Sequence, residues 1–381
     1  MNFGVKSIKF REEKNVLRVI PNVTIQSRED LSVHYTPGIA EVSKAIAKDP
    51  EKVFDLTIKR NSVAVISDGS AVLGLGNIGP EAALPVMEGK CLLFAKFADI
   101  DAFPICLKTQ DTNEIINIIR NISTSFGGIN LEDISAPRCF EIEEKLQDLG
   151  IPVMHDDQHG TAVVVLAGLI NALKVVNKNI EKTKIVISGA GAAGTAIATI
   201  LTDYSNHKAK IVVIDREGAI AINRPKLTPA KHKLAQLTQN KEHGELSDII
   251  QNADVYIGVS APNILSGAMV KSMRQDAIVF ALANPIAEID PIVAQRAGAK
   301  IVATGRSDFP NQINNVLAFP GIFRGALDAG AKTITKDMLL AAATALAGYV
   351  KSPTFNEIMP SPLDQNVVKI VANAVFKATK K

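Results

Sequence analysis

The sequence of 381 residues has no tryptophan, few other aromatic residues and few cysteines. Aromatic residues make up 5% of the chain, so the core must be built mainly from aliphatic side chains. The three cysteines, Cys91, Cys106 and Cys139, cannot all pair with one another, and their spacing fits no zinc-binding pattern. We therefore expect reduced thiols and an intracellular, cytoplasmic setting.

The chain also lacks a strong charge of one sign and a long apolar run. Lys and Arg number 42 and Asp and Glu 39, which gives a formal net charge of +3 and does not favour a nucleic-acid partner. The most apolar stretch, residues 161–176, contains Asn171 and Lys174 and is shorter than the ~20 residues of a membrane span. Charges throughout the N-terminal segment argue against a signal peptide. We expect neither a nucleic-acid nor a membrane partner.

The pattern of apolar residues predicts two domains of the α/β class. Strands and helices alternate regularly after residue 150, which is typical of a doubly wound parallel sheet of the Rossmann type. We place the boundary between residues 1–157 and residues 158–381, with the last ~50 residues helical. The first thirty residues are expected to form a loosely structured arm. The predicted strands cover residues 62–67, 71–75, 91–97, 103–107, 151–154, 184–188, 210–215, 255–259, 277–281 and 300–303, and the predicted helices cover 39–56, 114–122, 138–149, 160–176, 195–204, 338–350 and 365–378.

A glycine-rich turn between a strand and a helix predicts a dinucleotide site in the second domain. The first glycine permits a tight turn, the second lets backbone N–H groups approach a pyrophosphate, and the third permits close helix packing. Asp215 ends the following strand, where a carboxylate binds ribose hydroxyls and favours NAD. Arg216 leaves NADP open, because an arginine there can hold a 2′-phosphate. The predicted turn comprises Gly189, Ala190, Gly191, Ala192, Ala193 and Gly194.

A second motif of the same form, residues 74–79, is rejected as a nucleotide site. A helix after it would begin at Pro80, contain Pro85 and end at Gly89, which is too short for a standard crossover. We expect its glycines to let the backbone approach another segment closely.

Four motifs in the first 161 residues indicate chemistry when they are taken together: residues 35–38, 86–90, 127–133 and 155–161. Each alone has a plain structural explanation, such as a packed ring, a solvated lysine or a helix cap. Together they supply three carboxylates, those of Glu132 and Asp133 and one from the adjacent Asp156 and Asp157, which are suitable hard ligands for Mg²⁺ or Mn²⁺. Adjacent acids can turn inward only when a cation offsets their repulsion.

These motifs, with residues 281–285, 304–308, 314–315 and 319–320, resemble the malic enzyme family of short bacterial type over nearly the whole chain. The resemblance implies oxidative decarboxylation of malate to pyruvate and CO₂, with NAD or NADP and a divalent metal. It also implies a set of roles for residues of this sequence. Tyr35 would be the general acid, Lys90 the general base, Glu132, Asp133 and Asp157 the metal ligands, and Asn284 and Asn315 contacts to the substrate, with Asn284 also at the nicotinamide ribose.

One departure from the family pattern concerns the substrate carboxylate. Longer members carry an arginine just after the Asp-Gly turn, whereas this chain has Ser70 and Ala71 after Asp68 and Gly69. Carboxylate binding must therefore differ, and Ser70, backbone N–H groups or the asparagines are candidates.

We also expect the protein to form a homodimer, in which Tyr35 serves either its own or the neighbouring subunit. The alternative function is that of a malolactic-type lyase, which retains NAD without net release of NADH.

Overall fold

Two mainly parallel β-sheets organise the chain, and the computed structural model describes residues 3–380. The strands are β1 (Ser62–Ser67), β2 (Asp101–Cys106), β3 (Gly128–Leu131), β4 (Val153–His155), β5 (Lys184–Ser188), β6 (Lys210–Asp215), β7 (Gly218–Ala219), β8 (Val255–Gly258), β9 (Ala277–Ala281) and β10 (Ala299–Thr304). The first sheet has the order β2-β1-β3-β4, and the second has the order β10-β9-β8-β5-β6-β7. Only the short β7 pairs antiparallel to its neighbour among these strands. This arrangement confirms the predicted α/β class with a Rossmann-type second sheet.

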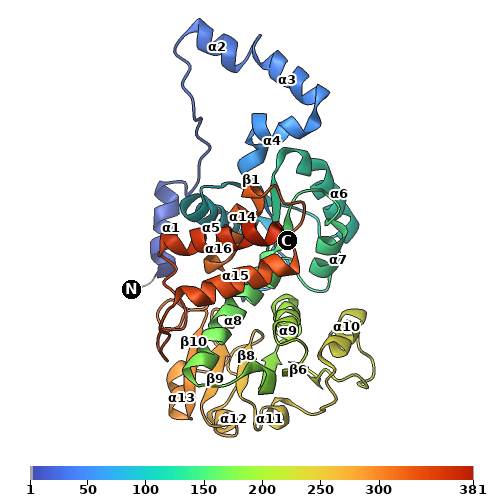
Figure 1. Cartoon of the computed structure of the whole chain (residues 1–381), viewed down its shortest axis with the longest axis vertical. Coiled ribbons are helices and arrows are strands. Elements are labelled where there is room, and N and C mark those ends of the chain that lie inside the picture. Colours follow the sequence, from blue (N-terminus) through green and yellow to red (C-terminus); the bar gives the residue numbers. More distant parts are fainter. Residues whose placement is uncertain (1–2, 381) are drawn as a thin grey trace.

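Helices cover these sheets and also extend beyond them (Figure 1). The helices of the first half are α1 (Phe3–Glu13), α2 (Arg28–His34), α3 (Ile39–Lys48), α4 (Val53–Leu56), α5 (Pro80–Ala98), α6 (Thr112–Ile122) and α7 (Arg138–Lys145). Those of the second half are α8 (Asp156–Val175), α9 (Ala192–Tyr204), α10 (Pro229–Thr238), α11 (Leu246–Ile249), α12 (Gly267–Lys271), α13 (Pro291–Arg296), α14 (Phe319–Asp328), α15 (Lys336–Tyr349) and α16 (Gln365–Thr379).

Helix α8 connects the two halves of the molecule. It begins directly after β4 and is buried along most of its length, because nearly every residue from Ala162 to Leu173 is apolar. By length and composition it is the one helix among residues 3–380 that could cross a membrane, yet 72% of that window is buried inside the protein. Its apolar character is therefore explained by its position in the core.

The C-terminal helices return to the first half of the chain. Helices α14 and α16 pack against α5, and α15 packs against α8. The Phe94 ring of α5 lies edge-on to Phe319 and Phe323 of α14, with ring centroids 4.7 Å and 5.4 Å away. These contacts fix the position of α5, which carries Lys90, relative to both domains.

Two predicted strands were wrong, because residues 91–97 are helical and residues 71–75 form a turn with one isolated bridge. Helix α5 runs through Pro85 and Gly89, because Ala83, Met87 and Phe94 bury one face at helical spacing. Tertiary burial thus outweighs the cost of an internal proline. Our argument that no full helix follows residues 74–79 was wrong for the same reason.

The N-terminal segment contains more helix than the predicted loose arm. Helices α1 and α2 lie within the first 34 residues, and α2 begins with a capping box at Ser27 and Asp30. Helices α2 and α3 project from the body of the molecule (Figure 1). No residue from 3 to 61 is buried in the single chain.

Candidate active site

A cavity of about 710 Å³ lies where the first sheet faces the Rossmann domain. One wall carries Lys90 with the three predicted metal ligands, and the opposite wall carries Ala193 of the glycine-rich turn. Ser260 and Ala283, which follow β8 and β9, complete that second wall. Asn284, Asn314 and Asn315 also line the cavity. The fold therefore brings the predicted base, metal ligands and asparagines to one place.

Lys90 is the only lysine or arginine among the residues that line this cavity. It is 7% exposed, and its Nζ lies 2.5 Å from Asp156 Oδ2 and 2.9 Å from Glu132 Oε1. Burial alone would lower the pKa of the Lys90 ammonium, but the charges of Asp156, Glu132 and Asp157 outweigh it and raise the pKa. In the protein without a bound cation, the neighbouring acids therefore hold Lys90 in its charged form.

Glu132, Asp133 and Asp157 form a compact carboxylate cluster beside this lysine. One oxygen from each lies within 4.8 Å of the others. The Asp133 N–H donates to Asp157 Oδ2 at 2.9 Å, and Asn130 Nδ2 donates to Glu132 Oε2 at 3.0 Å. Asp133 Oδ2 is buried and has no hydrogen-bond partner. Burial, followed by the charge of Asp157, raises the pKa of Asp133 to about 8. An unpartnered oxygen among crowded carboxylates fits a hard divalent cation.

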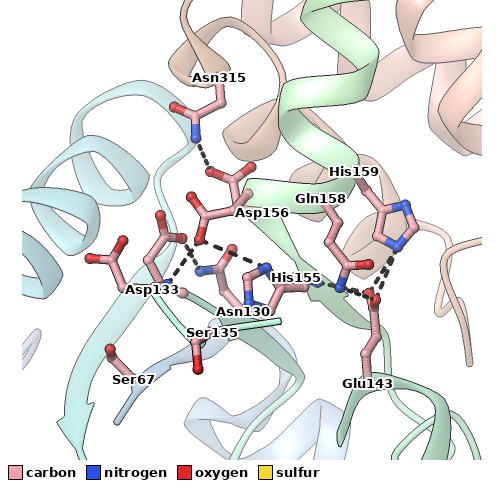
Figure 2. A network of polar contacts seen from close by, with 12 residues as sticks. Ser67, Asn130, Asp133, Ser135, Glu143, His155, Asp156, Gln158, His159 and Asn315 are labelled. Atoms are coloured by element: carbon pink, nitrogen blue, oxygen red, sulfur yellow. Dashed lines mark hydrogen bonds and ion pairs between the residues drawn. The ribbon is translucent and has the colours of Figure 1, made fainter. Parts of the chain in front are cut away.

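Asp156 is fully buried, and Figure 2 shows its side chain next to that of Asn315. Its Oδ2 accepts from Lys90 and from Asn315 Nδ2, each at 2.5 Å. Burial, partly offset by Lys90, raises the pKa of Asp156 to about 7. Asp156 therefore links the predicted base to the predicted substrate asparagine.

The first turn of α8 is held from below by Glu143 of α7 (Figure 2). Its carboxylate accepts the His155 N–H at 2.8 Å, Gln158 Nε2 at 2.8 Å and a contact to His159 Nε2. The sequence pattern gave no signal for Glu143, because a glutamate within an amphipathic helix is usually exposed. Its three partners fix the segment that carries Asp157.

The glycine-rich turn has the geometry that a pyrophosphate site requires. A Cβ on Gly194 would lie 1.8 Å from the Gly189 carbonyl oxygen, so the close packing of turn and helix needs glycine there. Gly189 has a φ of +119°. A Cβ on Gly191 would meet nothing within 4 Å, so this position, at the start of α9, faces open space. The residues present fit a bound dinucleotide phosphate.

Asp215, at the end of β6, is already paired with two cations. Arg224 donates to Asp215 Oδ1 at 2.8 Å and to Oδ2 at 2.6 Å, and Lys231 Nζ lies 2.7 Å from Oδ2. These contacts outweigh burial and lower the pKa of Asp215 to about 2. Sequence spacing identified Asp215, but it did not reveal Arg224, which lies in an irregular segment, or Lys231, which lies in the first turn of α10.

Of the two predicted catalytic residues, Lys90 and Tyr35, the structure does not bring Tyr35 to this cavity. It lies at the end of α2 and is 67% exposed, on the projecting segment of Figure 1.

Ser70, one candidate for the malate carboxylate, instead donates to Asp68 Oδ1 at 2.6 Å and accepts from the Ser135 N–H. Gly74 of the rejected motif lies against Asn284, where a Cβ would be 1.8 Å from the carbonyl oxygen. The expected close backbone approach is confirmed at Gly74, whereas a Cβ on Gly76 or Gly79 would meet nothing within 4 Å.

Comparisons with known proteins agree along the chain. Residues 12–147 match the family model described as "Malic enzyme, N-terminal domain", and residues 158–380 match "Malic enzyme, NAD binding domain". An NAD-dependent malic enzyme of Geobacillus stearothermophilus is 58% identical over 93% of this chain and 75% of its own. A bifunctional malic/malolactic enzyme of Bacillus subtilis is 52% identical over 93% and 88%. The crystal structure of a malic enzyme from Pyrococcus horikoshii is similar with a TM-score of 0.93 and 48% identity, over 99% of this chain and 90% of that one.

Proposed function

Because this chain belongs to the malic enzyme family, we propose that it oxidatively decarboxylates (S)-malate to pyruvate and CO₂ with reduction of NAD or NADP. The observation that carries the proposal is the shared cavity, in which Lys90 and three carboxylates face Ala193 of the glycine-rich turn. A small dicarboxylate and a nicotinamide would meet between these two walls.

Glu132, Asp133 and Asp157 would hold Mg²⁺ or Mn²⁺. Such an ion supplies Lewis acidity toward the substrate's hydroxyl and carbonyl oxygens. The protein's own contribution is to hold the three carboxylates close together: Asn130 fixes Glu132, and the Asp133 N–H fixes Asp157.

Lys90 is proposed to take the proton of the malate C2 hydroxyl. It can do so only after its own ammonium proton has moved away, since the carboxylates around it hold it in the charged form. Asp156 is placed to receive that proton, because its Oδ2 lies 2.5 Å from Nζ and burial raises its pKa to about 7. The hydrogen bond from Asn315 to the same oxygen would orient this carboxylate. Lys90 would thus accept the proton of the substrate hydroxyl, and Asp156 would accept the proton that Lys90 must first release.

Tyr35 is proposed to protonate C3 after CO₂ leaves, and to do so in the active site of a second copy of the chain. Residues 3–61 bury no side chain in the single chain, yet Val19, Val33 and Tyr35 are large apolar residues that are more than half exposed. A folded segment of this length needs a surface to cover its apolar face. Exchange of this segment in a homodimer would provide that surface and bring the partner subunit's Tyr35 to a cavity that lacks it.

NAD is proposed as the preferred dinucleotide, with NADP as a weaker alternative. Asp215 is ionised and lies where ribose hydroxyls bind in this type of fold. Arg224 and Lys231 are occupied by Asp215, so a 2′-phosphate would have to compete with that carboxylate for them. Arg224 and Lys231 are nevertheless the kind of cation that would bind the 2′-phosphate of NADP. Asp215 alone therefore does not decide between NAD and NADP.

A malolactic-type reaction, which retains NAD and releases no NADH, is the second candidate. The bifunctional relative of Bacillus subtilis, at 52% identity, is the observation that favours it. Both reactions would use the same cavity, so the residues above do not distinguish them.

Initial-rate kinetics with (S)-malate test these proposals together. We expect absorbance from reduced nicotinamide to increase with malate, to require Mg²⁺ or Mn²⁺, and to be faster with NAD than with NADP. Malate consumption that yields lactate without reduced nicotinamide would replace the first proposal with the malolactic one. No consumption of malate with either dinucleotide and either metal would refute both.

A further inference from the structure

Glu288 is a fully buried carboxylate that the proposed reaction does not use. It lies in the loop after β9, four residues beyond Asn284. No ion pair within residues 3–380 involves it. A buried carboxylate without a cationic partner is costly, so its hydrogen bonds must be accounted for.

Both carboxylate oxygens of Glu288 accept backbone N–H groups from the wall of the active-site cavity. The Ser260 N–H donates to Oε1 at 3.1 Å, and the Ala283 N–H donates to Oε2 at 3.1 Å. Ser260 and Ala283 follow the ends of β8 and β9 and line the cavity. The backbone hydrogen bonds between strands end before Ser260 and Ala283. The Glu288 carboxylate therefore accepts the two N–H groups that no neighbouring strand can accept.

The same contacts extend to the glycine-rich turn. Ser260 Oγ lies 3.2 Å from Ser188 Oγ, and Ser188 is the last residue of β5, directly before Gly189. One buried side chain is therefore connected to the carboxyl ends of three adjacent strands, β5, β8 and β9. In folds of this type, the dinucleotide binds outside these strand ends.

The space around Glu288 is closely fitted. A Cβ on Gly258, the last residue of β8, would lie 2.4 Å from Glu288 Cδ. A Cβ on Gly189 would lie 2.7 Å from the Val259 carbonyl oxygen and 3.2 Å from Ser260 Cβ. Movement of the Glu288 carboxylate would therefore be transmitted to the turn through backbone atoms that have little free space.

We propose that Glu288 is a positioning residue of the dinucleotide site, which sets the places of Ser260 and Ala283 and, through Ser188, of the glycine-rich turn. The inference rests on the proposed function only in taking this cavity as the nicotinamide side of the bound dinucleotide. It assigns Glu288 no contact with substrate or cofactor.

Glu288→Gln tests the proposal with little change in shape. The amide nitrogen cannot accept from a backbone N–H, so one of the two donors loses its acceptor within the protein. We expect the dissociation constant for NADH, measured by fluorescence titration without malate, to rise about tenfold. The Michaelis constant for the dinucleotide should rise similarly, and that for malate should change less than about twofold.

Asp254→Asn is the control for a buried carboxylate away from the cavity, and unlike Glu288, Asp254 also pairs with Lys178 and Arg274. Asp254 is 4% exposed and accepts the Lys184 N–H at 2.9 Å, but it lies just before β8, at the opposite end of the strand from the cavity. Both variants should lower the melting temperature, whereas only Glu288→Gln should weaken NADH binding. Equal NADH affinity in the two variants would overturn the positioning role and leave Glu288 as a purely structural residue.

If Glu288→Gln does not fold, Ser188→Ala tests the same connection by removing only a hydroxyl group. We expect NADH binding about threefold weaker than in the wild type, and unchanged binding would overturn the proposal. NADH binding needs no turnover, so these results stand apart from the proposed reaction. A wild-type protein that binds NADH but does not consume malate would refute the reaction and leave this test intact.

Discussion

Mixing two inactive variants tests whether each active site is shared between subunits. Lys90→Ala removes the proposed base, and Tyr35→Phe removes only the phenolic hydroxyl of the proposed acid. Lys90 is 7% exposed and lies among carboxylates, whereas Tyr35 is 67% exposed on a projecting segment of the same chain. Each variant alone should convert little or no malate to pyruvate, because Lys90 is proposed for the oxidation step and Tyr35 for the protonation that completes turnover.

The expected magnitude follows from counting sites. In a heterodimer with exchanged segments, one site contains Lys90 of the Tyr35→Phe chain together with Tyr35 of the Lys90→Ala chain. That site is complete, and the other lacks both groups. A purified heterodimer, obtained by co-expression with two different affinity tags, should therefore have about half the wild-type activity, and a random mixture about a quarter. Without exchange, every site lacks one group.

Folding of the Lys90→Ala chain is the main control. Removing the cation leaves Glu132 and Asp156 without their partner, which is normally costly. Asp156 has a pKa of about 7 because of burial, so it can take up a proton and limit this cost. Circular dichroism and sedimentation should show a folded dimer for each variant. A folded heterodimer no more active than its parents would refute the shared site.

Three further predictions concern the metal, the dinucleotide and a close backbone contact. Asp157→Asn should weaken Mn²⁺ binding by at least about tenfold in calorimetric titration, and full turnover in excess EDTA would refute the metal site. Asp215→Ser should release Arg224 and Lys231, so the NADP-to-NAD ratio of kcat/KM should rise about tenfold, and an unchanged ratio would refute our view of this cluster. Gly74→Ala should destabilise the protein by about 1–3 kcal/mol in denaturant unfolding, because its Cβ would meet the Asn284 carbonyl. Gly348→Ala, where a Cβ meets nothing within 4 Å, should not destabilise it.

Local periodicity predicted the second domain well, because its strands are continuous apolar runs buried on both faces. Strands β5, β6 and β9 have the predicted bounds, whereas α9 begins at Ala192, within the glycine-rich turn and three residues before the predicted start at Thr195. In the first domain the same reasoning failed at α5. Residues 91–97 are apolar enough for a strand, and only their contacts with α14 identify the segment as a helix.

The candidate site was predictable where motifs carry its side chains and unpredictable where distant segments meet. Lys90, Glu132 and Asp157 come from three separate motifs, and the structure places them around one cavity. Glu143 and Glu288 could not be foreseen, because each acts through hydrogen bonds to segments that no spacing rule connects to it. Whether Tyr35 contributes to the same cavity depends on a second copy of the chain.

Charge explains why the first domain holds so many buried acids. Glu132, Asp133, Asp156 and Asp157 surround a single lysine, and burial raises the pKa of each acid. With all four acids ionised, the cluster would carry three negative charges beyond the one that Lys90 balances, and like charges so close together strongly disfavour that state. Protons or a divalent cation must therefore reduce this charge, and the two compete for the same oxygens. A bound dication would favour loss of the protons held by the acids, and a proton held by Lys90 could then pass to Asp156. Because four acids surround Lys90, binding of the metal and loss of the ammonium proton from Lys90 could occur together.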